Sequence, residues 1–238
     1  MDEFIMNTLY VVATPIGNLE DFSFRALRIL SEVDLILCED TRITKKLLDH
    51  YRINKPTLSY HEHSDLKKVD YILGLLRKGK NLALVSDAGT PSISDPGGKL
   101  IKLAVESLGN SVRIVPIPGA SAVTTAISIS GFPMNKFIFM GFPPVKKKRK
   151  KFFEEIISSK YPVVFYESPY RIIKTLNELN SLYTKYSIIN IKIAIGRELT
   201  KKFETIYRGN IEKVIESVKN NIIKGEFVVI VGTKSKKV

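Results

Sequence analysis

The loop sequence VSDAGTPSISDPGG, residues 85–98, has the residue types of a ligand-binding loop. It holds two Asp, two Pro and three Gly directly after an apolar run, whereas most turns need only one or two such residues. Gly89 lets a ligand approach the main chain closely, and the carboxylate of Asp87 can accept hydrogen bonds from an amine or from hydroxyl groups. The segment therefore predicts a binding loop for a polar molecule. The alternative is a tight strand-to-helix connection in which Asp95 caps the helix.

Two further loops of similar composition follow apolar runs. They are TPIGN at 14–18 and PIPGAS at 116–121. In a parallel α/β sheet, the loops at the carboxyl ends of the strands gather along one edge, and ligands bind there. We therefore expect the three loops to form one site. Ser121 is expected to cap the following helix, and a contact with the ligand is compatible with that role.

Charged residues that could act as acids or bases occur near the same edge. Glu39 and Asp40 follow a second apolar run and are expected to face the ligand, unless they form a solvated turn or an ion pair with Arg42. His61 and His63 share a face in extended chain, but no third or fourth ligand accompanies them, so no metal site is predicted. His63 is a better candidate for a base or an RNA contact.

Two basic segments lie in the second half of the chain. GRELTKKFE, at 196–204, places Glu198 and Lys201 just after a predicted strand, either as an anion contact near the ligand or as a solvated loop. KKKRKK, at 146–151, is expected to be a mobile arm that contacts phosphates without sequence specificity. The alternative for this run is a purely solubilising role.

These loops need a sheet to position them, and the first half of the chain alternates short apolar runs with helical patterns. Strands are expected at 9–13, 34–38, 56–60, 82–86 and 112–116. Helices are expected at 24–31, with Ser23 as N-cap, at 44–51 and 66–78, and at 99–108, with Asp95 as N-cap. This alternation predicts parallel βαβ units.

The second half of the chain also combines strands with helices. A helix at 120–130 is followed by strands at 136–140, 163–166, 188–195, 204–208 and 227–231, and by helices at 150–158, 171–182 and 211–219. The predicted fold class is therefore α/β, with an N-terminal α/β domain over 1–117 and a basic C-terminal α/β domain over 118–238.

Charge is divided unevenly between the two halves. Up to Arg113 there are 15 Lys and Arg against 15 Asp and Glu, whereas from Gly131 on there are 22 Lys and Arg against 9 Glu and no Asp. A positive field confined to one half attracts polyanions, of which nucleic acid is the first candidate.

The composition excludes several classes of protein. The single cysteine, Cys38, excludes an intrachain disulfide and a cysteine zinc site. No apolar run approaches the roughly 20 residues of a membrane span, and the first residues lack a signal-peptide pattern, so we expect a cytoplasmic protein that does not associate with membranes. GxxxxGK(S/T), GxGxxG and GxSxG are all absent, which disfavours kinases, ATPases, ordinary dinucleotide dehydrogenases and α/β-hydrolases.

Several motifs together resemble the tetrapyrrole methylase superfamily. They are VATPIGNLEDFSFRA, CEDTR, VSDAGTPSISDPG, VPIPGASA, GFPP, YESPYR, RELTKKFE and GEFVVIV, which follow one another in order over residues 9–231. The first loop carries ATPIGN in place of the GxGPG of the tetrapyrrole enzymes. In this it is similar to the branch of the superfamily that methylates ribosomal RNA.

The resemblance implies a fold, a cofactor and an assembly. It implies two α/β domains with S-adenosyl-L-methionine (SAM) bound in the cleft between them, in a homodimer. Carried over position by position, it implies a SAM site lined by Asp87, Gly89, Thr90, Pro91, Ser121 and Ala122. Tyr166, Gly196 and Phe227 of the second domain are implied to close over the cofactor.

The resemblance also implies an activity, the 2′-O-methylation of a cytidine ribose in the decoding centre of 16S rRNA, within the small ribosomal subunit. A 2′-hydroxyl is a weak acid, so a base or a polarising cation should assist the transfer. The candidates for this role are Glu39, His63, Glu198 and Lys201. The residues expected to contact RNA are Arg25, Arg42, Lys146, Lys147, Lys148, Arg149, Lys150, Lys151 and Lys202.

Two other functions stay open on the sequence. A SAM-dependent methyltransferase acting on a tetrapyrrole would also use a basic half, because tetrapyrroles carry many carboxylates. A non-catalytic RNA-binding factor could keep the same fold. The altered first loop and the basic run at 146–151 favour RNA over a tetrapyrrole.

Overall fold

The computed structural model describes residues 7–61, 64–221 and 223–233. They form two compact units, which divide between Ser121 and Ala122 rather than after Ile117. The loop at 116–121 therefore belongs to the N-terminal unit. None of the helices in these residue ranges is long and apolar enough to cross a membrane.

The N-terminal unit is built on a five-stranded sheet in which every neighbouring pair of strands is parallel. The strand order is β3-β2-β4-β1-β5. A parallel sheet requires a crossover between successive strands, which accounts for the alternation of apolar runs and helical patterns. The strands are β1 (Asn7–Val12), β2 (Leu35–Cys38), β3 (Thr57–Ser59), β4 (Leu82–Leu84) and β5 (Val112–Ile117).

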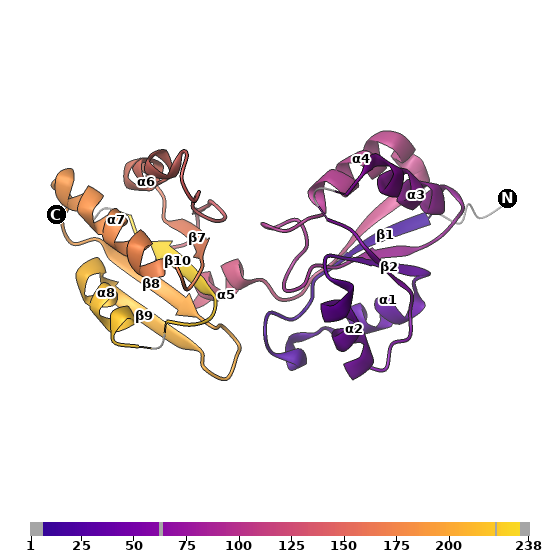
Figure 1. The fold of residues 1–238 in the computed structure, drawn as a ribbon, viewed down its shortest axis with the longest axis horizontal. Helices are drawn as coiled ribbons and strands as arrows, with labels where there is room; N and C mark the ends of the chain where they lie inside the picture. Colours follow the sequence, from indigo (N-terminus) through magenta and orange to yellow (C-terminus); the bar gives the residue numbers. More distant parts are fainter. Residues whose placement is uncertain (1–6, 62–63, 222, 234–238) are drawn as a thin grey trace. The chain divides into compact units, whose positions relative to one another are not determined.

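Helices cover both faces of this sheet, with α1 and α2 on one side and α3 and α4 on the other (Figure 1). The side chains of β4 show the two layers, because Ala83 packs with the cluster under α1 whereas Leu82 and Leu84 pack with the cluster under α3. Burial on both faces makes such a strand a continuous apolar run. The helices are α1 (Phe24–Glu32), α2 (Thr41–His50), α3 (Leu66–Arg77) and α4 (Gly98–Leu108), with 3-10 turns at η1 (Leu19–Asp21) and η2 (Gly109–Ser111).

The N-cap predicted for α1 is confirmed, and the one predicted for α4 is wrong. Ser23 caps α1 as predicted, since its side chain accepts a hydrogen bond from the Ala26 N–H. Asp95 is not the N-cap of α4, because Gly97 occupies that position. The φ of Gly97 is +142°, a conformation that residues with a side chain rarely adopt, so the helix begins only after this glycine.

The C-terminal unit has a mixed five-stranded sheet with the order β6-β7-β10-β8-β9. β6 and β7 are parallel, and the other neighbouring pairs are antiparallel. The strands are β6 (Ile138–Phe139), β7 (Val163–Glu167), β8 (Lys192–Arg197), β9 (Thr205–Asn210) and β10 (Phe227–Val231). The helices are α5 (Ala122–Ile129), α6 (Arg149–Ser158), α7 (Ile172–Lys185) and α8 (Ile211–Lys219).

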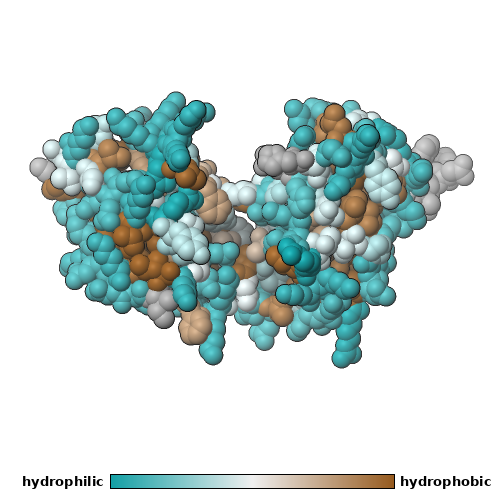
Figure 2. Space-filling view, in the orientation of Figure 1, coloured by the Kyte–Doolittle hydropathy of each residue, from teal (hydrophilic) through white to brown (hydrophobic). Residues whose placement is uncertain are grey.

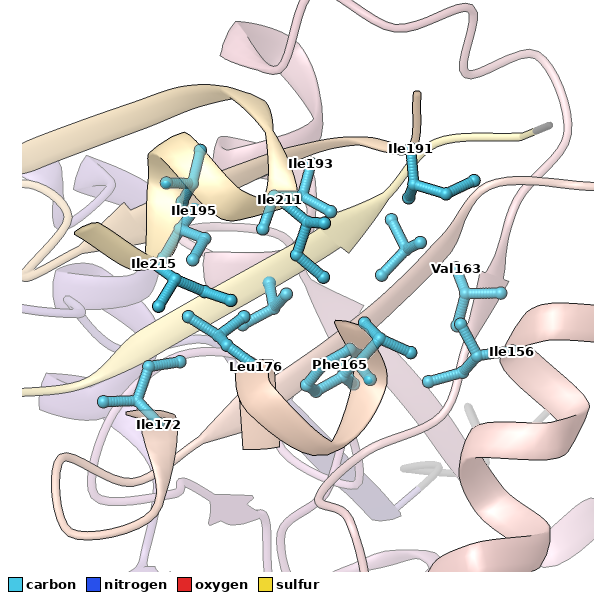
Figure 3. Close-up of a cluster of buried hydrophobic side chains, with 14 of the residues drawn as sticks. Ile156, Val163, Phe165, Ile172, Leu176, Ile191, Ile193, Ile195, Ile211 and Ile215 are labelled. Atoms are coloured by element: carbon cyan, nitrogen blue, oxygen red, sulfur yellow. The ribbon is translucent and has the colours of Figure 1, made fainter. Parts of the chain in front are cut away.

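One apolar cluster holds α6, α7 and α8 against the sheet of the C-terminal unit. Figure 3 shows side chains from different elements converging, among them Ile195 of β8, Phe165 of β7 and Ile215 of α8. Full burial of such a side chain contributes about 1.5–3 kcal/mol. The cluster therefore gives the loops at the ends of these strands a rigid base.

Candidate functional site

Two of the three glycine- and proline-rich loops are joined by a short backbone bridge. Thr14 and Gly89 exchange two hydrogen bonds, with N···O distances of 2.9 and 3.0 Å. The Thr14 hydroxyl also donates to the carbonyl of Ser86 at 3.1 Å. The first and second loops are therefore held in one rigid arrangement, as their position at one edge of the sheet predicts.

The third loop is attached to the other two. The Thr90 hydroxyl donates to the carbonyl of Ala120 at 3.1 Å, and the Ala13 N–H donates to the carbonyl of Ile117 at 3.2 Å. A Cβ on Gly119 would lie 3.0 Å from the Cβ of Ala13, so glycine is needed for this close approach. The structure thus brings Asp87, Gly89, Thr90 and Pro91 together with the loop that ends at Ser121, and Ala122 begins α5.

The reason for glycine at position 89 differs from the sequence interpretation. Its φ is +88°, and a Cβ there would lie 3.3 Å from the Ile16 side chain. Both of its backbone polar groups are bonded to Thr14. Gly89 therefore shapes the loops by closing the bridge to the first loop, and its main chain is occupied by protein.

A polar pocket of about 390 Å³ lies at the ends of β2, β3 and β4. The Asp40 N–H donates to Asp87 Oδ1 at 3.0 Å, which uses one of the two oxygens of that carboxylate and ties the loop after β4 to the start of α2. The residues that line the pocket are Glu39, Asp40, Thr41, Arg42, Ser59, His61 and Asp87.

The carboxylates of this pocket differ in their electrostatics. Burial, followed by the negative charge of Asp87, raises the pKa of Glu39. Burial also raises the pKa of Asp87, with a contribution from Asp40. In contrast, the hydrogen bonds from Arg42 hold the pKa of Asp40 well below its usual range. Glu39 and Asp87 therefore hold their protons to higher pH than ordinary surface carboxylates.

Arg42 forms the ion pair that the sequence left as one of two alternatives. Its Nη2 lies 2.6 Å from Asp40 Oδ2, and its side chain is 86% exposed. An exposed pair of this kind contributes little to stability. Arg42 is therefore accessible at the rim of the pocket, and Arg25 is exposed on α1.

Two of the candidates for the base or polarising cation, Glu198 and Lys201, are paired within the C-terminal unit. Lys201 Nζ lies 3.0 Å from Glu198 Oε1 and 3.0 Å from Glu226 Oε2, and Glu198 also accepts the Glu226 N–H at 2.9 Å. Burial opposes the charge of Lys201, but the hydrogen bonds to the two carboxylates outweigh it and raise the pKa of Lys201. Lys201 is thus held as a cation, which makes it a poor base.

The residues expected to close over the cofactor from the second domain have structural roles of their own. The Phe227 side chain is 2% exposed and belongs to the core. A Cβ on Gly196 would lie 2.8 Å from Leu199 Cδ2, so any larger residue there would have to displace the Leu199 side chain. Tyr166 is half-buried on β7, and its ring packs against Phe139 and Phe142.

The prediction of a mobile arm at 146–151 is wrong. Residues 149–151 form the first turn of α6, and Arg149 is 8% exposed. Its guanidinium bonds to Glu178 at 2.7 Å, to the Thr175 hydroxyl at 2.6 Å and to the Pro144 carbonyl at 3.1 Å. Arg149 therefore holds the loop in place and is not available to phosphates. The other five members of the run are exposed: Lys146, Lys147, Lys148, Lys150 and Lys151.

Glu167 and Arg171 form a buried ion pair that sequence reasoning missed. The Glu167 carboxylate is fully buried, and it accepts hydrogen bonds from the Ser168 N–H at 2.8 Å and the Thr175 hydroxyl at 2.5 Å. Arg171 Nε lies 2.9 Å from this carboxylate, and Arg171 Nη1 donates to the Pro143 carbonyl at 3.1 Å. The signal was the motif YESPYR, whose charged residues stand four apart.

The described residues contain no group of three or more His, Cys, Asp or Glu that could hold a metal ion. His61 lies at the polar pocket, whereas His63 lies outside the described residues. The proposed role of His63 as a base or an RNA contact stays a prediction.

Comparison with known proteins identifies the family. The model for tetrapyrrole (corrin/porphyrin) methylases matches residues 8–215. The ribosomal RNA small subunit methyltransferase I of Halalkalibacterium halodurans is 45% identical over 232 residues, covering 97% of this chain and 78% of the relative. The protein of that name from Thermotoga maritima is 42% identical over 229 residues, covering 96% of this chain and all of the relative.

Solved structures agree on the fold. A diphthine synthase superimposes with a TM-score of 0.70 at 17% identity, over 97% of this chain and 91% of that one. Cobalt precorrin-4 methyltransferase superimposes with a TM-score of 0.68 at 18% identity, over 98% of this chain and 97% of that one. These likenesses confirm the predicted α/β class with two sheets. The chain therefore belongs to the tetrapyrrole (corrin/porphyrin) methylase family, among the relatives named ribosomal RNA small subunit methyltransferase I.

Proposed function

We propose that the chain transfers a methyl group from SAM to the 2′-hydroxyl of a cytidine ribose in the decoding centre of 16S rRNA. The observation that carries this proposal is the 45% identity, over 97% of the chain, to a ribosomal RNA small subunit methyltransferase I. The exposed lysines at the start of α6 and the positive charge of the second half agree with a polyanionic substrate.

The rim formed by the three loops fits the chemistry of SAM. The pocket beside it presents Glu39 and Asp87, two carboxylates whose pKa values are raised by burial. Carboxylates accept hydrogen bonds from ribose hydroxyls and from an ammonium group, and their negative charge favours a cationic sulfonium nearby. We therefore assign Asp87, Thr90, Pro91, Ser121 and Ala122 to the cofactor, with Gly89 shaping the loop.

The protein's main task in such a transfer is alignment. Bound SAM supplies a methyl group that is already activated by the sulfonium charge. The rigid rim restricts the relative orientation of the reacting groups, and positioning of this kind can lower a barrier by several kcal/mol. Glu39 is the base we propose for the ribose hydroxyl, because Glu198 and Lys201 are bonded to each other whereas Glu39 opens into the pocket.

Replacing Glu39 with Gln should slow methyl transfer about 100-fold or more, since general bases contribute roughly 10²–10⁴-fold. The wild-type rate should rise with pH as Glu39 loses its proton. Because burial and Asp87 raise the pKa of Glu39, this rise should occur at higher pH than for an ordinary glutamate. Single-turnover rates across a pH series measure both effects. A variant that keeps the wild-type rate and pH profile would remove Glu39 from the base role.

Neutralising the five exposed lysines at 146–148 and 150–151 to Gln should weaken RNA binding and reduce its salt dependence. Each lost phosphate contact reduces the magnitude of the negative slope of log K against log[salt] by about 0.7–0.9. Arg149 is left in place because it is structural. The matched control neutralises five exposed cations of the N-terminal unit, Lys67, Arg77, Lys78, Lys99 and Lys102. An equal change of slope in both variants would mean a general charge effect with no lysine contact.

The alternatives are separated by giving the protein labelled SAM with different acceptors. Small ribosomal subunits that lack the modification should take up the methyl group, whereas a carboxylated tetrapyrrole such as uroporphyrinogen should not. Label in the tetrapyrrole alone would support the small-molecule enzyme. Calorimetry that finds no SAM binding would support a non-catalytic RNA-binding factor.

The proposed homodimer is tested separately, by sedimentation of the full chain over a range of concentrations. A mass of two chains is expected, and a single chain at all concentrations would contradict it.

A further inference from the structure

Two segments of the C-terminal unit lie side by side at one edge of its sheet. They are the loop at 140–148, between β6 and α6, and the turn at 168–171, between β7 and α7. β6 and β7 are parallel neighbours, so their carboxyl ends meet at the same edge. Arg171 Nη1 joins the two segments directly through its 3.1 Å hydrogen bond to the Pro143 carbonyl.

These segments expose apolar and aromatic side chains beside lysines. Tyr170 is 96% exposed, the highest fraction among the large hydrophobic side chains of the described residues, and Phe142 and Val145 are 51% and 69% exposed. Lys146, Lys147 and Lys148 follow directly and are exposed as well. Around α6 and the loop before it, the visible face is mostly hydrophilic, with hydrophobic side chains between (Figure 2). We call these six residues the aromatic–lysine surface.

A buried polar network holds this surface rigid. Glu167 binds Arg171 and Thr175, and Thr175 in turn accepts a hydrogen bond from Arg149. Arg149 and Arg171 then fix the carbonyls of Pro144 and Pro143. A side chain presented by a fixed backbone loses less conformational freedom on binding than one on a loose loop. The exposure of Tyr170 is therefore a property of an ordered surface.

We propose that the aromatic–lysine surface binds an unpaired stretch of RNA, with the Tyr170 ring stacked on a base and the lysines on the neighbouring phosphates. The proposal rests on the function proposed above and adds the form of the substrate. Aromatic rings beside cations are the usual means of holding single-stranded nucleic acid, because every base has a stacking face. A duplex keeps its bases stacked inside and cannot use Tyr170 in this way. The lysines match a phosphate backbone better than an apolar protein partner.

The test uses the full chain and a short single-stranded oligoribonucleotide that carries 2-aminopurine, whose fluorescence falls when the base stacks. Tyr170→Ala should abolish the quenching and weaken binding about 5- to 100-fold, with the salt slope unchanged because no charge is lost. Tyr170→Phe keeps the ring and should bind like wild type. Tyr71→Ala is the matched control, since Tyr71 is also exposed, at 57%, but lies on α3 of the N-terminal unit.

Each alternative outcome overturns the proposal. Wild-type affinity and quenching in Tyr170→Ala would show that no base stacks there. If Tyr170→Ala weakened binding of a perfectly paired RNA duplex as much as binding of the single strand, the surface would not select unpaired RNA. A change in the sedimentation of Tyr170→Ala, with RNA binding intact, would make the surface a protein interface. Methyl transfer by the wild-type chain to small ribosomal subunits is measured separately from oligonucleotide binding. Loss of the stacking result with methyl transfer present would overturn this proposal alone, whereas absence of methyl transfer would overturn the proposed function.

Discussion

Replacing Asp87 with Asn is expected to weaken SAM binding about 10- to 100-fold and to reduce methyl transfer at limiting SAM. Hydrogen bonds to a charged group contribute about 1.5–3 kcal/mol, and the substitution removes the charge while keeping the size of the side chain. The amide of the variant would also retain an oxygen acceptor for the Asp40 N–H, which donates to Asp87 Oδ1 at 3.0 Å in the wild type. The loops should therefore keep their shape, and the loss should come from the ligand contact alone.

Titration calorimetry with SAM measures this effect directly. Because burial raises the pKa of Asp87, wild-type affinity should fall as the pH is lowered, and it should do so at higher pH than for an ordinary Asp. The Asp87→Asn variant should lose the part of this pH dependence that comes from Asp87. Asp70→Ala, which removes an exposed acid on α3, serves as the control of equal charge. Wild-type affinity in Asp87→Asn would remove this loop from the cofactor site.

Replacing Glu167 with Ala is expected to lower the free energy of unfolding by about 3–5 kcal/mol, the usual loss when one partner of a buried ion pair is removed. The Glu167 carboxylate is fully buried and forms an ion pair with Arg171. It also accepts hydrogen bonds from the Thr175 hydroxyl and the Ser168 N–H. Its removal leaves Arg171, which is 24% exposed, without its counter-ion. The loop at 140–148 should loosen with it, because Arg171 also holds Pro143.

Urea unfolding of the full chain measures this loss of stability, and Glu216→Ala, at an exposed position on α8, is the control. RNA binding should also weaken in Glu167→Ala under conditions where the variant is still folded, since the lysines at 146–148 lose their fixed position. A loss well below the expected range, no larger than that of the control, would mean that the network contributes little and that packing alone positions the loop.

Local patterns predicted the elements well because the relevant signals lie within a few residues of one another. The helix at 211–219 and the strand at 227–231 have the bounds that periodicity predicts, since an amphipathic stripe and a buried run are local properties. The gathering of three loops at one edge was also predictable, because parallel strands share a direction. The Thr14–Gly89 bridge confirms that the first two loops meet.

The errors occurred where a residue depends on partners far along the chain. A run of six cations gives no sign that Arg149 is buried, because its partners Glu178 and Thr175 lie 29 and 26 residues away. The sequence also gave no sign of the ion pairs of Lys201, because one of its two carboxylate partners, Glu226, is 25 residues away. In both cases the pairing depends on residues far along the chain, and composition could not show it.

The central claim is that the chain methylates a ribose of the small-subunit RNA, and mapping the transferred group tests it most directly. Small subunits lacking the modification are incubated with the wild-type chain and SAM that carries a labelled methyl group, and the RNA is digested and analysed by mass spectrometry. We predict one labelled nucleotide, a cytidine of the decoding centre with the methyl group on its 2′-oxygen. A label on a base, at another site or on no RNA at all would contradict the account.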